Sequence, residues 1–150
     1  MSTPAKICTI LMADDDAEDH LLVRDALRET GLNHDLRVVS DGEELLDYLH
    51  GRAKYRTLPD LPRPDLVLLD LNMPKKDGRE VLQEIKADGA WQRIPIVVLT
   101  TSTADDDVGF SYDMGASSYI TKPVTFRAWV DLVRVLSKYW FELVKLPPES

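Results

Sequence analysis

Four polar positions follow apolar runs in the sequence, and their side chains could together bind a metal ion and a phosphoryl group. The aspartates Asp14–Asp16 follow the run ICTILMA, and Asp70 follows LVLL. Thr100 ends the run IVVLT, and Lys122 follows the shorter run SSYIT. Carboxylates are ligands for a hard cation such as Mg²⁺, and an aspartate near such a cation can act as a nucleophile toward phosphorus. An ammonium group and a hydroxyl could then bind the phosphoryl oxygens.

Each position taken alone also has an ordinary structural explanation. An acidic triplet is most often a solvated turn or a helix cap, and a threonine at the end of a strand is a weak signal. Asp70 is a stronger signal, because an ionised group at the end of a buried strand is costly without a partner. The hypothesis of a site therefore depends on whether the fold brings the four positions together.

The pattern of apolar residues predicts five strands, each followed by a helix. Strands are expected at residues 6–13, 35–39, 65–71, 95–100 and 117–121. Helices are expected at residues 19–30, 43–50, 78–88 and 125–144, with another that begins at a capping box in residues 103–106. This alternation predicts an α/β fold with a doubly wound, five-stranded parallel sheet and helices on both faces. In such sheets ligands bind at the carboxyl ends of the strands, where the four polar positions lie.

Length and composition predict one cytoplasmic domain over residues 1–150, with its core at about residues 6–145. The net charge of −8 argues against nucleic acid as a partner, and no apolar run is long enough to span a membrane. The single cysteine, Cys8, is interpreted as a small core residue. Residues 51–64 contain three prolines and four basic residues and are expected to form a long surface loop.

Four stretches make the chain resemble the CheY-like receiver domains of two-component response regulators. They are ILMADDD at 10–16, LVLLDLNMPKKDG at 66–78, PIVVLTTS at 95–102 and GASSYITKP at 115–123. The resemblance implies a sheet of strand order 2-1-3-4-5, with Asp70 as the phosphoacceptor in a Mg²⁺-dependent reaction. It also implies that Asp15 is the direct metal carboxylate and Asp14 its acidic neighbour, and that Asn72 offers its backbone carbonyl to the metal.

The same resemblance implies roles for residues around the phosphoacceptor. Thr100 and Lys122 would contact the phosphoryl group, and Tyr119 would turn inward when the Thr100 hydroxyl moves. The side chains of Asn72 and Ser102 would tune the rate of hydrolysis. The peptide bond between Lys122 and Pro123 is expected to be cis, as it usually is in this family.

Features outside the common core make the chain similar to the small response regulators paired with cyanobacterial phytochromes. These features are the 51–64 loop, LTTS at 99–102, SYD at 111–113 and YWF at 139–141. The resemblance implies a histidine kinase partner of the phytochrome type. Only residues 146–150 remain beyond the predicted core, so no output domain is expected. Signalling would then proceed through altered protein binding rather than through an enzymatic output.

The terminal helix predicts a homodimer, because its apolar arc is too wide for one buried face. Phe126, Tyr139 and Val144 lie beyond the core-facing stripe, and Trp140 lies on it. These four residues are the candidate dimer interface. The alternative is that a few apolar side chains are simply exposed.

Three other functions are alternatives to a phosphorylation switch. A haloacid-dehalogenase-like phosphatase needs a second aspartate two residues after the nucleophile, and Asn72 stands there. A flavodoxin-like flavin binder needs a phosphate-binding loop after the first strand, where three aspartates would repel phosphate. A receiver that only docks partners would not need the complete set of acidic, hydroxyl and lysine positions.

Overall fold

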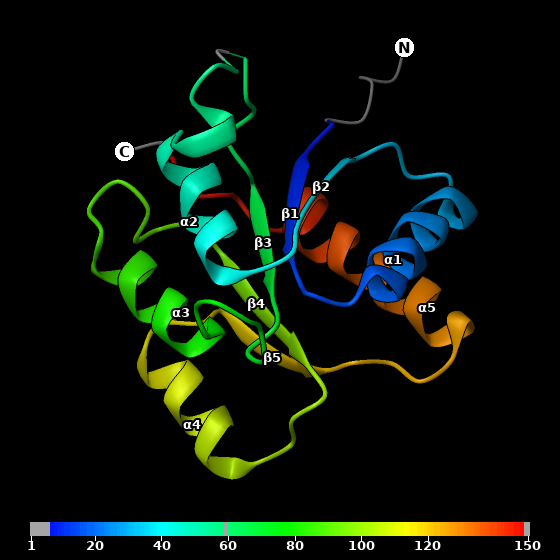
Figure 1. The fold of residues 1–150 in the computed structure, drawn as a ribbon. Coiled ribbons are helices and arrows are strands. Elements are labelled where there is room, and N and C mark those ends of the chain that lie inside the picture. The colour runs from blue at the N-terminus through cyan, green and yellow to red at the C-terminus, as the bar shows by residue number, and fades with distance from the viewer. Residues whose placement is uncertain (1–6, 59, 149–150) are drawn as a thin grey trace.

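The computed structural model describes residues 7–58 and 60–148, and these form an α/β fold with a central parallel sheet (Figure 1). All strand pairs are parallel, and the order β2-β1-β3-β4-β5 confirms the prediction from the sequence. The strands are β1 (Thr9–Ala13), β2 (Asp35–Val39), β3 (Leu66–Leu69), β4 (Ile96–Thr100) and β5 (Ser118–Thr121).

The helices follow the strands as expected, and most begin at a side chain that caps them. They are α1 (Ala17–Thr30), α2 (Gly42–His50), α3 (Gly78–Ala87), α4 (Asp105–Asp113) and α5 (Phe126–Ser137). Asp16, Asp41, Asp77 and Thr125 each accept a hydrogen bond from a backbone N–H in the first turn of the following helix. Gly31 ends α1 in the left-handed region at φ 71°, which a glycine adopts without strain.

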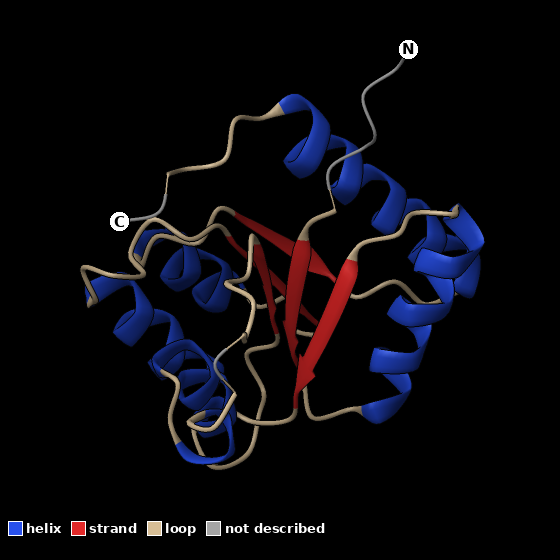
Figure 2. Cartoon of the chain, turned by 90° about the horizontal axis from the view of Figure 1, so that it is seen from above, coloured by secondary structure: helices blue, strands red, loops and turns tan. Residues whose placement is uncertain are grey.

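Helices cover both faces of the sheet and enclose two apolar cores. Figures 1 and 2 show α1 and α5 on one face and α2, α3 and α4 on the other. Trp129 of α5 is fully buried against Val23 and Leu27 of α1 and against strand residues. The other core joins Leu45, Leu82 and further helix residues to the opposite side chains of β1, β3 and β4. Strands buried on both faces explain the nearly all-apolar runs in the sequence.

The structure corrects several predicted boundaries. The first strand begins at Thr9 rather than at residue 6, and α1 begins at Ala17 rather than at Asp19. The capping box predicted at Thr103 is wrong: Ala104 occupies the N-cap position of α4 without a side-chain cap. The hydroxyl of Ser102 instead accepts the N–H of Ala104 at 3.3 Å.

The terminal helix is shorter than predicted and changes its hydrogen-bonding pattern. α5 ends at Ser137, and the chain continues as a π-helical segment, η2 (Lys138–Leu143). The described part of the 51–64 region is largely exposed and contains one short 3-10 turn, η1 (Ala53–Tyr55). Residue 59 lies outside the described residues.

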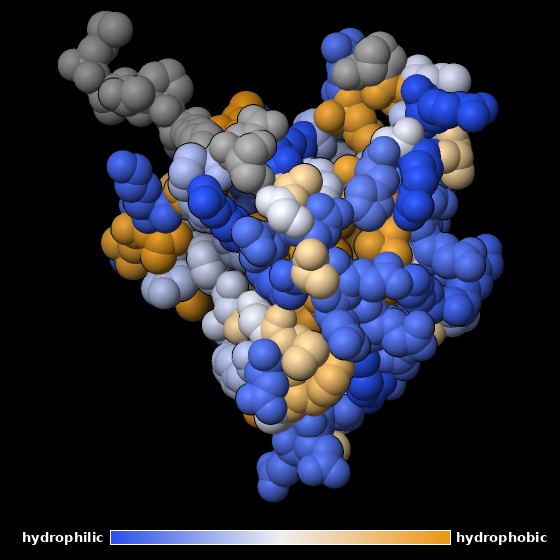
Figure 3. Space-filling model, turned by 90° about the vertical axis from the view of Figure 1, so that its left-hand side faces the viewer, coloured by the Kyte–Doolittle hydropathy of each residue, from blue (hydrophilic) through white to orange (hydrophobic). Residues whose placement is uncertain are grey.

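The surface on the side of α2, α3 and α4 is mostly hydrophilic, with apolar residues in separate patches (Figure 3). Within residues 7–58 and 60–148, no helix is both long enough and apolar enough to cross a membrane.

Candidate metal and phosphoryl-acceptor site

The carboxyl ends of the strands bring the predicted polar positions to one edge of the sheet. The N–H of Asp70 donates to the carbonyl of Ala13 at 3.0 Å, which aligns the end of β3 with the end of β1. The N–H of Lys122 donates to the carbonyl of Thr100 at 2.8 Å, which aligns the end of β5 with that of β4. Backbone pairing in the sheet therefore positions the four chain segments before any side chain makes a contact.

Three carboxylates gather at this edge. Oxygen atoms of Asp14, Asp15 and Asp70 all lie within 4.8 Å of one another. Asp14 and Asp70 are buried, whereas Asp15 is exposed. Three negatively charged oxygen donors at this spacing, one of them open to solvent, fit a divalent cation that prefers oxygen ligands and retains water.

Lys122 lies between the carboxylates. Its Nζ is 2.9 Å from Asp14, 2.7 Å from Asp19 and 3.0 Å from Asp70. Burial alone would lower the pKa of Lys122, but the contacts with these three carboxylates outweigh burial and raise the pKa above its ordinary value. The amine is therefore a permanent cation beside Asp70.

The expected cis bond before Pro123 is not found, because the described residues contain no cis peptide bond. Lys122 nevertheless reaches Asp70 with a trans bond to Pro123. A four-carbon side chain that starts at the edge of the sheet is long enough to reach the carboxylates without a cis bond.

Asp14 is the most perturbed acid of the cluster. Burial raises the pKa of Asp14 from 3.8 to about 6, and the contacts with Lys122 and with the N–H of Asp16 oppose this rise only in part. The ionised form of Asp14 is therefore costly in the folded protein unless further positive charge is nearby, which is what a bound cation would supply.

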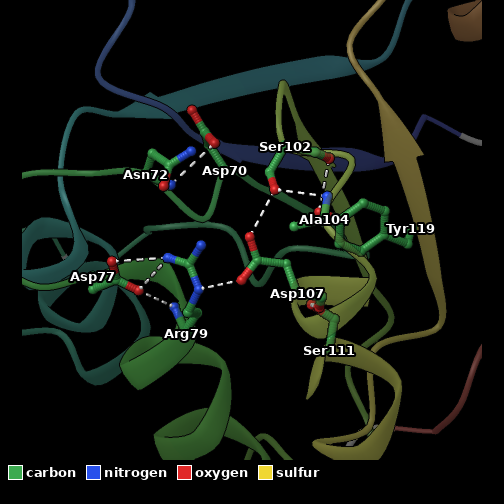
Figure 4. Close-up of polar contacts among 9 residues, drawn as sticks. All are labelled: Asp70, Asn72, Asp77, Arg79, Ser102, Ala104, Asp107, Ser111 and Tyr119. Atoms are coloured by element: carbon green, nitrogen blue, oxygen red, sulfur yellow. Dashed lines mark hydrogen bonds and ion pairs between the residues drawn. The ribbon is translucent and has the colours of Figure 1, made fainter. Parts of the chain in front are cut away.

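The loop after Asp70 packs tightly against the start of α3. The N–H of Asn72 donates to Asp70 Oδ1 at 3.2 Å, and Asn72 itself is exposed (Figure 4). The N–H of Gly78 donates to the carbonyl of Leu71 at 2.9 Å. A Cβ atom at position 78 would overlap the carbonyl oxygen of Asp70, so only glycine allows this approach.

Thr100 and Tyr119 lie beside the cluster in different states of hydrogen bonding. Thr100 is fully buried, and no described residue supplies a hydrogen-bond partner for its Oγ1. Tyr119 is half-buried and packs against the core on the α2–α3 side. Its hydroxyl donates to the carbonyl of Ser102 at 2.9 Å. The ring is therefore turned inward, and the Thr100 hydroxyl is free to bind an added acceptor.

Two contacts at the site were not expected from the sequence. Asp19, in the first turn of α1, makes the shortest of the three contacts to Lys122. Asp107, in the first turn of α4, binds Arg79 and Ser102. A first-turn acid is ordinary in sequence, so neither residue carried a signal that could have distinguished it.

The candidate dimer residues differ in exposure. Phe126 and Tyr139 are exposed, whereas Trp140 is half-buried, packs against the α1–α5 core and contacts the Tyr139 ring edge-on at 5.1 Å. Val144, which follows η2, is also half-buried. The packing of Trp140 against the α1–α5 core agrees with its predicted place on the core-facing stripe.

Comparison with known proteins identifies the family. The model of the response regulator receiver domain matches residues 10–134. The chain is 41% identical to response regulator Rcp1 of Synechocystis sp., over 97% of this chain and 96% of that protein. Among solved structures it resembles the phosphorylated cyanobacterial phytochrome response regulator RcpA, at 40% identity and a TM-score of 0.86, over 95% of this chain and 100% of that one.

The Mn²⁺-bound form of Rcp1 is also similar, at 40% identity and a TM-score of 0.84, over 94% of this chain and 99% of that one. Its metal is in keeping with the acidic cluster at the edge of this sheet. On these grounds, the chain belongs to the response regulator receiver domain family and is homologous to phytochrome response regulators.

Proposed function

We propose that this protein is a phosphorylation switch in which Asp70 accepts a phosphoryl group from a partner histidine kinase. The observation that carries the proposal is the contact of Lys122 Nζ with Asp70 Oδ2 at 3.0 Å, beside an acidic cluster suited to a divalent cation. A new bond forms between an Asp70 oxygen and phosphorus while the phosphorus–nitrogen bond of the kinase phosphohistidine breaks.

Five residues of the chain would serve this transfer. Asp14, Asp15, Asp70 and the carbonyl of Asn72 would bind Mg²⁺, which, when present, offsets negative charge on the phosphoryl oxygens. Lys122 would turn from the carboxylates to a phosphoryl oxygen, since its ammonium group already lies in the crevice. Transfer would thus need little rearrangement of the side chains around Asp70.

The response would pass through Thr100 and Tyr119. The unpartnered Thr100 hydroxyl would donate to a phosphoryl oxygen, and Tyr119 would be held inward beside it. The surface formed by α4, β5 and α5 would then change its affinity for partners. Hydrolysis of the acyl phosphate would reset the switch at a rate tuned by Asn72 and Ser102, with transfer and hydrolysis both confined to the protein's own aspartate.

Two finer proposals concern the partners. The similarity to phytochrome response regulators supports a phytochrome-type light sensor as the kinase, and such a kinase would phosphorylate the protein in the cytoplasm. The exposed apolar side chains Phe126 and Tyr139 support a homodimer through α5 and η2. Residues 1–150 would then act as one receiver domain that signals by binding.

The test is phosphorylation by acetyl phosphate in the presence of Mg²⁺, followed by intact mass. The wild-type chain should gain the mass of one phosphoryl group, Asp70→Asn should gain none, and EDTA should abolish the gain. The control Asp60→Asn makes the same change in the exposed loop and should be phosphorylated like the wild type. Phosphorylation that survives in Asp70→Asn would refute the assignment. Phosphotransfer profiling against purified histidine kinases would then identify the partner.

A further inference from the structure

A polar network joins three elements next to the site (Figure 4). Arg79, at the start of α3, donates from Nε to Asp107 Oδ1 at 2.8 Å and from Nη1 to Asp77 at 3.1 and 3.2 Å. The second oxygen of Asp107, in the first turn of α4, accepts from the hydroxyl of Ser102 at 2.7 Å. The network thus ties α3 to α4 and to the loop that follows β4.

Ser102 is the point at which this network meets Tyr119. Its hydroxyl is engaged by Asp107, and its carbonyl accepts the hydrogen bond from the Tyr119 hydroxyl at 2.9 Å. Ser102 lies two residues after Thr100 in the chain. A shift of Ser102 therefore also moves the loop that carries the Thr100 hydroxyl. Ser102 therefore holds both the loop and the Tyr119 ring. Asp107, which lies outside the phosphoryl-acceptor crevice, holds Ser102 in place through its hydrogen bond.

Asp107 is anchored more firmly than a first-turn acid requires. Its backbone carbonyl accepts from the hydroxyl of Ser111 at 2.8 Å, and the contacts with Arg79 and Ser102 lower the pKa of its carboxyl to about 2. By contrast the side chains of Asp105 and Asp106, which are exposed in the same turn, form no hydrogen bond or ion pair within the described part of the chain. Helix dipole stabilisation would apply to all three acids, so it does not explain why only Asp107 is bound.

We propose that Arg79, Asp107 and Ser102 form a latch that holds Tyr119 inward before Asp70 is phosphorylated. The inference rests on the proposed function, in which the phosphoryl group on Asp70 favours the same inward arrangement. Two influences that favour one conformation strengthen each other, and the coupling is reciprocal. The latch therefore enlarges the fraction of molecules in the conformation that accepts the phosphoryl group, and phosphorylation in turn tightens the latch.

The solvent exposure of Arg79 and Asp107 determines how strongly their contact stabilises the inward position of Tyr119. The side chains of Arg79 and Asp107 are 30% and 19% exposed, so solvent screens their attraction in part. The bonds are charge-assisted and one donor is a guanidinium, which makes them stronger than an ordinary exposed ion pair. Loss of the latch should lower the ratio of inward to outward Tyr119 by about fivefold.

The first measurement follows Tyr119 without any phosphoryl group. Fluorotyrosine is incorporated, and the ¹⁹F resonance of Tyr119 is identified by its loss in Tyr119→Phe. Asp107→Asn and Arg79→Gln should shift this resonance toward that of an exposed ring. The control Asp106→Asn removes the same charge from the same turn and should leave the resonance unchanged. An unshifted Tyr119 in Asp107→Asn would overturn the proposal.

The second measurement is the phosphorylation rate with acetyl phosphate and Mg²⁺. Asp107→Asn should be phosphorylated more slowly than the wild type, by at most about fivefold, while Asp106→Asn should match the wild type. Saturating beryllofluoride, a phosphoryl mimic, should return the Tyr119 resonance of Asp107→Asn to the wild-type position, which damage to the fold would not permit. Rates equal to wild type in Asp107→Asn would count against the latch.

The two proposals fail in different ways. A wild-type chain that is not phosphorylated on Asp70 would refute the proposed function, whereas the Tyr119 resonance of the unmodified protein would still test the latch. If Asp107→Asn does not fold, Ser102→Ala breaks the network while both charges remain. It should shift Tyr119 in the same direction, and an unshifted resonance there would overturn the proposal.

Discussion

Lys122 faces Asp14, Asp19 and Asp70, and exposed Asp15 adds a fourth negative charge nearby. One ammonium group therefore balances several carboxylates, two of which are buried. Such an arrangement is poor for stability but suitable for binding a cation, because the unbalanced charge is removed when the cation arrives. Repulsion between these carboxylates therefore lowers the free energy of unfolding when no cation is bound.

The substitution Asp14→Asn should reveal how much stability is lost by ionising the buried Asp14 carboxyl. Because the folded-state pKa of Asp14 is about 6 and the ordinary value is 3.8, ionisation of this group opposes folding. The cost is absent below about pH 4, grows between about pH 4 and 6, and is complete above about pH 6. In EDTA at pH 7.5, Asp14→Asn should therefore raise the free energy of unfolding by about 1–3 kcal/mol, measured by urea denaturation.

At pH 4 the same substitution should give no gain, because Asp14 is then protonated in the folded protein. Mg²⁺ should stabilise the wild type more than Asp14→Asn and so reduce the difference at pH 7.5. The exposed control Asp25→Asn should change stability little at either pH. A loss of stability for Asp14→Asn at neutral pH in EDTA would contradict this interpretation.

At the scale of elements, His34 connects the start of β1 to the C-terminal segment. Its Nδ1 accepts the N–H of Cys8 at 3.2 Å, and its ring contacts that of Phe141 in η2 at 4.7 Å between centroids. Burial lowers the pKa of His34, although Asp65 and Glu142 act in the opposite direction. The neutral imidazole therefore helps to dock the π-helical segment, which leaves the regular path of α5 after Ser137.

This docking should weaken in acid. A histidine whose folded-state pKa lies below 6.5 contributes stability that is complete above about pH 6.5 and is lost as pH falls through the folded pKa. His34→Asn retains an acceptor near Nδ1 but loses the ring contact, so it should be less stable than the wild type by about 1 kcal/mol at pH 7.5. Urea denaturation should show this gap narrowing toward pH 5.5. A gap that is independent of pH would rule out titration of His34 as the cause.

At the scale of the whole molecule, the functional edge and the proposed dimer surface are separate parts of one chain. The acidic cluster lies at the carboxyl ends of the strands, whereas exposed apolar side chains follow α5 and η2. Val135 and Tyr139 are 63% and 50% exposed, although both belong to a segment whose other side is packed on α1. Because apolar exposure on an otherwise packed helix is costly, a second copy of the chain is the proposed cover.

The homodimer can be tested by placing charge on this surface. Val135→Glu combined with Tyr139→Glu should raise the dimer dissociation constant at least about tenfold, because the added carboxylates would be desolvated in the interface. Sedimentation analysis at several concentrations measures this change. The control Leu21→Glu adds a charge at an equally exposed position of α1 and should leave the dissociation constant unaltered. A wild-type chain that stays monomeric at high concentration would remove the proposal.

Much of the fold could be read from local patterns. The all-apolar runs of β3 and β4 predicted buried parallel strands, and the predicted end of the first helix at residue 30 agrees with the end of α1. The incorrect predictions also concerned local features, at the ends of two helices. The cap of α4 was misassigned to Thr103, and the terminal helix was continued through η2, because caps and π-helical hydrogen bonding depend on the neighbouring loop and core rather than on apolar spacing.

The sequence by itself determined the parallel sheet with helices on both faces and the edge at which Asp14, Asp70, Thr100 and Lys122 meet. Strict alternation and doubly buried runs leave few ways to arrange a parallel sheet, and every strand then ends at the same edge. Tertiary structure alone decided the finer contacts: Asp19 with Lys122, Asp107 with Arg79 and Ser102, and the inward ring of Tyr119. These depend on rotamers and on distances between elements far apart in the chain, for which a single sequence carries no periodic signal.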